Sequence, residues 1–233
     1  MPTPEIGLLC AAAIASMVIA SGGRPAVQPR VTIVAMGDST TAGTPAFLSP
    51  VEMPPHGAGD ETSQYAYWLM KQYPAWEVLN RGVNGERSDE IAARFDRDVI
   101  AASPAVVVLI AGVNDIYQGR QPSQVQRQLR AMYDKAIAAG ISVVAGSIIP
   151  FNTATPEQNA RMRTVNAWIR EQADRDPAVE FVDTRVAVAV PGNADLLAST
   201  PDQLHPSAEG YRRMADAIAP VVAAVLARRT GKN

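Results

Sequence analysis

Two short stretches far apart in the chain carry side chains that together can perform nucleophilic catalysis. The sequence GDST at residues 37–40 places Ser39 directly after an apolar run, and DQLHP at 202–206 places Asp202 three residues before His205. A serine hydroxyl is a weak nucleophile until a base takes its proton, and a histidine base needs a carboxylate to fix its tautomer. The residue types and their spacing therefore predict acyl transfer.

Each stretch also has a purely structural interpretation. GDST is typical of a glycine turn followed by a capping residue, and DQLHP of a turn that enters a helix with a proline near its first position. The other histidine of the chain, His56, lies in a proline-rich loop without a nearby Cys, His or acid pair, so we expect a solvated side chain and not a metal ligand. Neither stretch decides the function alone.

Two further stretches supply candidate donors for the oxyanion that forms in acyl transfer. They read GVNGE at 82–86 and GVND at 112–115. The backbone N–H groups of Ser39 and Gly85 and the side-chain amide of Asn114 would provide three donors. Asn-Gly is also a common turn dipeptide, and an Asn-Asp pair also caps helices.

The elements that must position these residues alternate between short apolar runs and amphipathic stretches. Short β-branched runs are typical of buried parallel strands, and the stretches between them are long enough for crossover helices. Strands are predicted at 31–36, 77–80, 106–110, 141–149 and 179–182, and helices at 64–72, 89–102, 123–139, 156–173 and 208–229. This alternation predicts a single three-layer α/β domain with a parallel sheet, in which loops at the carboxyl ends of the strands bind the ligand.

Three local features refine this prediction. Ser88 is expected to cap the helix that starts at Asp89, with negative charge at its positive end. Residues 44–62, rich in Pro and Gly, are expected to form a loop after the first strand. Tyr67, Trp68 and Trp168 have apolar neighbours at helical spacing and are expected in the core or at its rim.

Composition excludes several classes of function. A chain of 233 residues with 47% apolar content is long enough to bury a full core without metals or disulfides. Its net charge of -2, from 21 basic and 23 acidic residues without a long run of either sign, predicts no binding to nucleic acid or to an anionic membrane. We predict no cofactor and no metal ion.

The first twenty residues differ from the rest. Residues 6–20 are almost purely apolar and end in small residues, which predicts a signal peptide at 1–20 and a secreted or periplasmic protein, although no Lys or Arg precedes the run. About 15 apolar residues fall short of the roughly 20 that span a bilayer, so stable membrane insertion is not expected. A linker at 21–30 and a catalytic domain at 31–233 follow. Cys10, the only cysteine, would leave with the signal peptide.

The four stretches together resemble the SGNH hydrolase superfamily, the GDSL-type esterases and lipases, whose name gives Ser, Gly, Asn and His from four blocks in that order. GDST, GVNGE, GVND and DQLHP occur in that order at predicted strand ends, and the resemblance spans residues 31 to about 226. It implies a flavodoxin-like sheet of about five strands. It also implies Ser39 as nucleophile, His205 as base, Asp202 as the residue that orients it, and Gly85 and Asn114 as oxyanion donors.

The resemblance leaves the substrate open. Thr40 stands where many members have Leu, a variation also found in carbohydrate acetyl esterases of the superfamily. We expect an esterase acting through an acyl-enzyme on small acyl esters or acetylated glycans, with a lysophospholipase or thioesterase as the alternative within the superfamily. A non-catalytic binding module on the same fold is the alternative from another class. Asp38 and Asp115 are expected to bind loop backbone.

Overall fold

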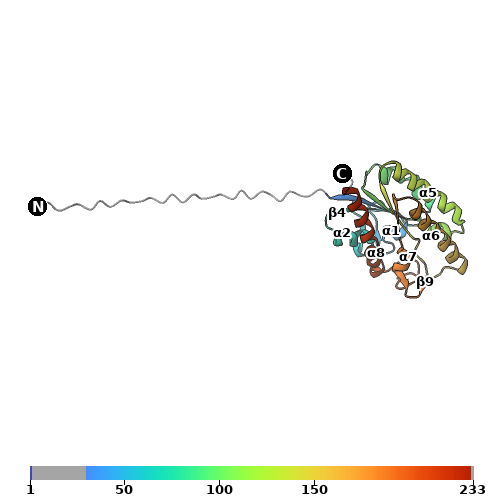
Figure 1. Ribbon diagram of the computed structural model, residues 1–233. Helices are drawn as coiled ribbons and strands as arrows, with labels where there is room; N and C mark the ends of the chain where they lie inside the picture. The colour runs from blue at the N-terminus through green and yellow to red at the C-terminus, as the bar shows by residue number, and fades with distance from the viewer. Residues whose placement is uncertain (2–29, 232–233) are drawn as a thin grey trace.

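The computed structural model describes Met1 and residues 30–231. Apart from Met1 and Arg30, the predicted signal peptide and the predicted linker lie outside the described residues. Within them the chain forms one domain in which a central sheet lies between helices (Figure 1).

The central sheet has five parallel strands in the order β4-β1-β5-β6-β7. The strands are β1(Val31–Gly37), β4(Trp76–Gly82), β5(Val106–Ile110), β6(Ser142–Gly146) and β7(Val179–Val182). Counted along the chain this order is 2-1-3-4-5, the flavodoxin-like order, in which the ligand crevice opens where the direction of winding reverses. That point lies between β1 and β5, so the predicted fold is confirmed.

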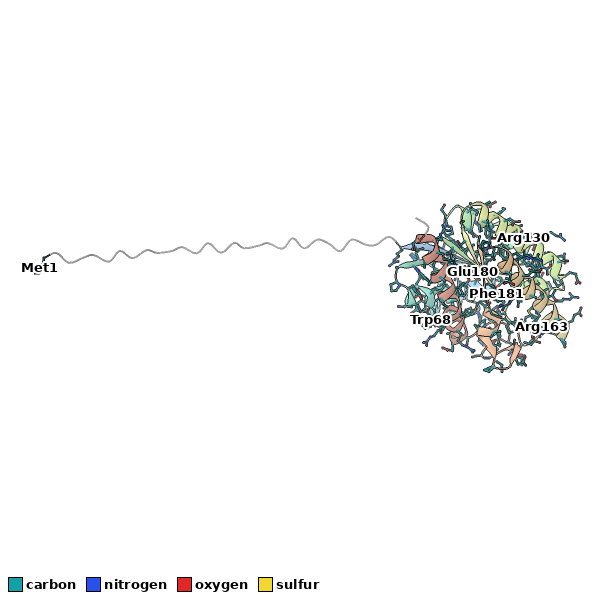
Figure 2. All side chains as sticks on the ribbon, viewed as in Figure 1. Met1, Trp68, Arg130, Arg163, Glu180 and Phe181 are labelled. Atoms are coloured by element: carbon teal, nitrogen blue, oxygen red, sulfur yellow. The ribbon has the colours of Figure 1, made fainter. Side chains whose placement is uncertain are left out.

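Helices cover both faces of the sheet because successive strand residues point to opposite sides. Val34 and Met36 of β1 pack against one helical layer, and Ile33 and Ala35 pack against the other. The first layer contains α3(Ser88–Ala93), α5(Pro122–Ala138) and α6(Pro156–Arg175), and the second contains α2(Tyr65–Gln72), α7(Thr184–Val188) and α8(Ala208–Thr230). Trp68 of α2 and Arg163 of α6 accordingly lie on opposite sides of the molecule (Figure 2).

The structure corrects three predicted boundaries. The helix expected at 89–102 ends at Ala93 and is followed by a single π-helical turn, η2(Asp96–Ile100), because local periodicity does not distinguish the two forms. Ser88 is the first residue of α3, and Arg87 occupies the N-cap position, where its backbone N donates to the Glu90 carboxylate; Asp89 and Glu90 do occupy the first turn. The strand expected at 141–149 stops at Gly146. The Ser147 backbone N still donates to the Val182 carbonyl oxygen of β7, but the Ser147 carbonyl oxygen accepts from the Thr184 hydroxyl and the Ile148 backbone N donates to Asn166.

Several short elements were not predicted, because segments this short show no periodicity. They are α1(Ser39–Ala42), β2(Phe47–Leu48), β3(Ala58–Gly59), η1(Glu61–Ser63), α4(Val113–Tyr117), β8(Ala189–Val190) and β9(Asn193–Leu197). The expected loop at 44–62 contains β2 and β3, which pair as an antiparallel hairpin. Two of the short helices, α1 and α4, begin at predicted functional blocks.

Candidate active site

Ser39 is the first residue of α1 and follows β1 after one intervening residue, Asp38. Asp38 caps the helix, and its Oδ1 accepts a hydrogen bond from the Thr40 backbone N at 2.9 Å. A side chain at Gly37 would overlap Thr41 and the Ile110 carbonyl oxygen, so the sharp turn out of the sheet requires glycine there. The Ser39 side chain is thereby fixed at the carboxyl end of β1.

Asp38 is fully buried behind Ser39. Burial raises the pKa of its carboxyl group from 3.8 to about 7, and the hydrogen bonds from Thr40 oppose the shift only in part. Its second oxygen, Oδ2, has no hydrogen-bond partner among the described residues. The bond to Thr40 matches the structural role expected for Asp38.

Asp202 and His205 lie in the loop before α8 and bond directly. His205 Nδ1 lies 2.7 Å from Asp202 Oδ2, while Asp202 Oδ1 accepts from the backbone N of Leu204 at 2.9 Å and of His205 at 2.8 Å. Partial burial raises the pKa of Asp202, but the hydrogen bonds from His205 and Leu204 outweigh it, and the net pKa is lowered. Ser207, and not Asp202, caps α8. The aspartate is therefore placed to orient the imidazole.

The turn between these two residues has unusual backbone geometry. Gln203 has a φ of 68°, in the left-handed region that residues other than glycine rarely occupy. Its carbonyl oxygen accepts a hydrogen bond of 2.7 Å from the Asn152 backbone N. In this conformation the loop folds back, so that the Asp202 carboxylate bonds both to the backbone N–H groups of Leu204 and His205 and to the His205 ring.

The two remaining predicted blocks meet at the side chain of Asn114. Asn114 Nδ2 donates to the Glu86 carbonyl oxygen at 2.9 Å, which occupies one of its two N–H bonds. Asp115 accepts from both the backbone N and the hydroxyl of Ser88, at 2.7 and 2.8 Å, so it holds the loop backbone as expected. Burial raises the pKa of Asp115, against the hydrogen bonds from Ser88.

A cavity of about 160 Å³ brings most of the predicted residues together. Its walls are Ser39, Thr40, Asn84, Val113, Asn114, Tyr117, Phe151, Leu204 and His205. Asp202 lies behind His205 and does not line the cavity. Gly85 does not line it either, although its neighbour Asn84 does, and Gly85 has a φ of 79° with open space around it. The structure records no hydrogen bond between the side chains of Ser39 and His205.

The apolar walls were not predicted from the sequence. Phe151 is buried after β6, and its ring meets that of Tyr117 edge-on with centroids 5.6 Å apart. Tyr117 is 56% exposed at the mouth of the cavity. Val113 and Leu204 could have been noticed, because each lies inside a predicted block, next to Asn114 and His205 respectively. Phe151 carries no such signal.

The other candidate groups lie elsewhere. His56 is exposed in the loop, and Tyr67, Trp68 and Trp168 are partly buried, as expected. Within residues 30–231 no group of three or more His, Cys, Asp or Glu side chains could hold a metal ion, and no helix there is long and apolar enough to cross a membrane.

A larger hollow of about 690 Å³ opens at the opposite edge of the sheet, beside the start of β1 and the end of α8. None of the predicted site residues line it. Its charged groups bond to the protein itself, since Arg228 pairs with Glu180 and Arg229 donates to the Gly140 carbonyl oxygen. We therefore place the candidate active site in the smaller cavity.

The fold and this cavity define a class of protein: a three-layer α/β domain that gathers a serine, an imidazole–carboxylate pair and an amide at the carboxyl end of a parallel sheet. The family model described as GDSL-like Lipase/Acylhydrolase matches residues 35–213. The chain belongs to that family.

Similar proteins include two esterases. An acetylxylan esterase from Geobacillus stearothermophilus is 28% identical over 155 residues, which cover 60% of this chain and 69% of that protein. Esterase TesA from Pseudomonas aeruginosa is 30% identical over 118 residues, which cover 48% of this chain and 52% of that protein.

A solved acetylxylan esterase from the same Geobacillus species has the same fold. It is 20% identical, covers 82% of this chain and 93% of its own, and superimposes with a TM-score of 0.63. Two of its structures are of catalytic mutants, in which a histidine, or an aspartate three residues before it, is replaced by alanine.

Proposed function

We propose that this acylhydrolase is a serine esterase that hydrolyses carboxylic esters of short acyl groups through an acyl-enzyme. One observation carries the proposal: Ser39, Asn114 and His205 line one cavity, and Asp202 bonds the ring nitrogen that faces away from it. The same spacing of aspartate and histidine in the catalytic mutants of the acetylxylan esterase supports the roles of Asp202 and His205.

In the first half of the reaction His205 Nε2 takes the proton of Ser39 Oγ, which attacks the ester carbonyl carbon. The Asp202 carboxylate accepts a hydrogen bond from the Nδ1–H of His205 and stabilises the imidazolium. The oxyanion accepts hydrogen bonds from the backbone N–H groups of Ser39 and Gly85 and from the Asn114 N–H that Glu86 leaves free. His205 then donates its proton to the alcohol oxygen as the C–O bond breaks.

In the second half a water molecule takes the place of the alcohol. His205 removes its proton, the water oxygen attacks the acyl carbon, and the same donors bind the second oxyanion. Collapse of this intermediate breaks the bond to Ser39 Oγ, which regains its proton from His205. The products are the free acid and the restored enzyme.

The size of the cavity favours a short acyl group. At about 160 Å³ it is smaller than the roughly 300 Å³ or more of pockets that enclose a drug-sized ligand. Val113, Phe151 and Leu204 give it apolar walls suited to an acetyl methyl group. The alcohol part of the ester then lies outside, next to the exposed ring of Tyr117. The acetylxylan esterase among the similar proteins supports an acetylated carbohydrate as the substrate.

The proposal is tested with nitrophenyl esters of increasing chain length and with acetylated xylan. We expect kcat/KM to be highest for the acetate, to fall as the chain lengthens, and acetate to be released from the xylan. Ser39→Ala should abolish all of these activities, whereas Ser123→Ala, at an exposed serine of α5, should change none. Activity that increases with chain length would reject the short-acyl substrate. Equal activity of the Ser39→Ala protein would reject the nucleophile, and inactivity of the parent protein would favour a binding module.

We also propose that the protein is exported and that residues 1–20 are removed. The support is the apolar run at residues 6–20 and the small residues after it. Amino-terminal sequencing of protein from the periplasm or the medium should find a start near Ser21. Protein that retains Met1 in the cytoplasm would contradict this.

A further inference from the structure

Arg94 is a buried cation that the proposed reaction does not use. It follows the last residue of α3, and its side chain is 8% exposed. Burying a charge is costly unless it is paired and hydrogen-bonded, so the partners of such a side chain indicate what it holds in place.

The guanidinium group of Arg94 bonds in four directions. Nε lies 2.6 Å from a carboxylate oxygen of Glu86, and Nη1 lies 2.7 Å from a carboxylate oxygen of Asp98. Nη1 also donates to the Arg81 carbonyl oxygen at 2.8 Å, and Nη2 to the Gly37 carbonyl oxygen at 2.9 Å. Four of its five N–H bonds are therefore engaged.

Two of these partners belong to the proposed catalytic machinery. Gly37 is two residues before Ser39, at the turn that presents the nucleophile, and its carbonyl oxygen also accepts from the Val83 backbone N at 3.2 Å. Glu86 directly follows Gly85, and its carbonyl oxygen fixes the Asn114 amide. Arg94 thus bonds to Gly37, in the segment that presents Ser39, and to Glu86, in the segment that carries Gly85 and orients Asn114.

We propose that Arg94 is a positioning residue that sets the distance between Ser39 and the oxyanion donors Gly85 and Asn114. This inference rests on the proposed function. The fork of a guanidinium can hold several oxygen atoms in fixed directions at once, and a lysine ammonium on a flexible stem cannot. Displacement of reacting groups by about 1 Å can lower a rate about 100-fold, so a loosened connection should be visible in turnover.

The test combines Arg94→Lys with Asn114→Ala in a double-mutant cycle. Arg94→Lys should lower kcat for nitrophenyl acetate about 10- to 100-fold with KM little changed. In the Asn114→Ala background the same change should cost much less, because the donor that Arg94 positions has already been removed. If Arg94 had a structural role alone, Arg94→Lys would lower the melting midpoint and leave kcat of the folded fraction unchanged. It would then show no coupling to Asn114→Ala.

The matched control is Arg185→Lys, at another buried arginine. Arg185 is 4% exposed and bonds to Asn159 at 2.7 Å and to Asp195 at 2.8 Å, without contact to the nucleophile or oxyanion segments. It should lower stability and show no coupling to Asn114→Ala.

If Arg94→Lys does not fold, Glu86→Gln replaces it in the cycle, because it weakens only the bond to the guanidinium. Unchanged kcat in the folded variant, or purely additive losses, would overturn the inference. Activity that survives Ser39→Ala would instead overturn the proposed function.

Discussion

The two halves of the proposed catalytic site are held in different ways. At the nucleophile end Ser39 is 4% exposed, and bonds from distant parts of the chain surround it. Arg94 binds the Gly37 carbonyl oxygen, Asn80 Nδ2 donates to the Ala42 carbonyl oxygen at 3.0 Å, and the hydroxyls of Thr41 and Tyr65 lie 3.1 Å apart. This end is part of the core.

The histidine end depends mainly on its own turn. The side chains of Asp202 and His205 are 32% and 13% exposed, and their bonds reach no further than three residues. In the described part of the chain, residues 200–205 have one hydrogen bond to a distant segment, from Asn152 to Gln203. Regions with few long-range bonds open at lower free energy. The base is therefore the part of the site that can adjust to a substrate, while the nucleophile stays fixed.

The largest effect is expected at the histidine end, from His205→Gln. We expect kcat to fall by roughly a millionfold, as for members of a triad that act as a unit. Parent activity should rise with pH, because His205 accepts the Ser39 proton only in its unprotonated form. The pKa of Asp202 is lowered, so its carboxylate stays ionised near neutral pH and adds no second step to the pH profile of the rate. Rate measurements across this pH range test both points.

His56→Gln, at the exposed histidine of the loop, is the control and should keep both rate and pH profile. If His205→Gln kept the rate and the pH profile of the parent, His205 would not be the base.

The next effect belongs to the fixed end. Asn114→Ala should lower kcat by about 10² to 10³ with KM little changed, as for removal of one oxyanion donor. Asn114 lies inside α4 and does not cap it, so loss of its bond to Glu86 should cost only about 1 kcal/mol of stability. Measurement of kcat, KM and the melting midpoint separates these effects. A destabilised protein with unchanged kcat would leave the backbone amides as the only donors.

The sequence predicts the sheet well because its strands are buried on both faces. The runs at 106–110 and 179–182 coincide with β5 and β7, and the first three predicted blocks lie at the ends of β1, β4 and β5, whereas DQLHP lies in the loop before α8. Local patterns do not reveal which distant groups meet. Phe151 lies 112 residues from Ser39 in sequence yet lines the same cavity. The partners of Arg94 come from the ends of β1 and β4, from the loop after β4 and from its own helical segment. Such contacts exist only once the fold has formed.

A smaller effect tests the burial of Asp38. Its pKa is 3.8 in the unfolded chain and about 7 in the fold, so between these values the folded protein binds more protons and stability falls as pH rises. Asp38→Asn removes this term. The free energy of unfolding of the variant, measured in urea, should therefore improve relative to the parent from pH 4 to pH 7.

Asp60 provides the comparison for Asp38. It makes the same bond to the backbone N two residues later, at 3.0 Å, but it is exposed and its hydrogen bonds to Thr62 lower its pKa. Asp60→Asn should lose stability relative to the parent as pH rises through the acidic range. If the stability of both variants relative to the parent changed in the same direction as pH rose, burial would not determine the pKa of Asp38.

The smallest effect concerns the strained turn at the flexible end. Left-handed backbone costs a residue other than glycine roughly 1 to 2 kcal/mol, and glycine adopts it freely, although glycine also raises the entropy of the unfolded chain. Gln203→Gly should therefore stabilise the protein by less than about 1 kcal/mol. Ser103→Gly is the matched control, because Ser103 has a φ of 46° in an exposed turn outside the cavity.

Only one of these two glycine variants should change turnover. Glycine at 203 lets the loop sample other conformations, so Asp202 and His205 spend less time in the bonded geometry and kcat falls a few-fold. Ser103→Gly should leave kcat at the parent value while giving a similar change in melting midpoint. Comparison of kcat and the melting midpoint in the two variants separates the effect on stability from the effect on the geometry of the base. If Gln203→Gly kept full activity, the turn would hold His205 in place without the strained residue. The contrast between the fixed and flexible ends would then rest on the hydrogen bond from Asn152 alone.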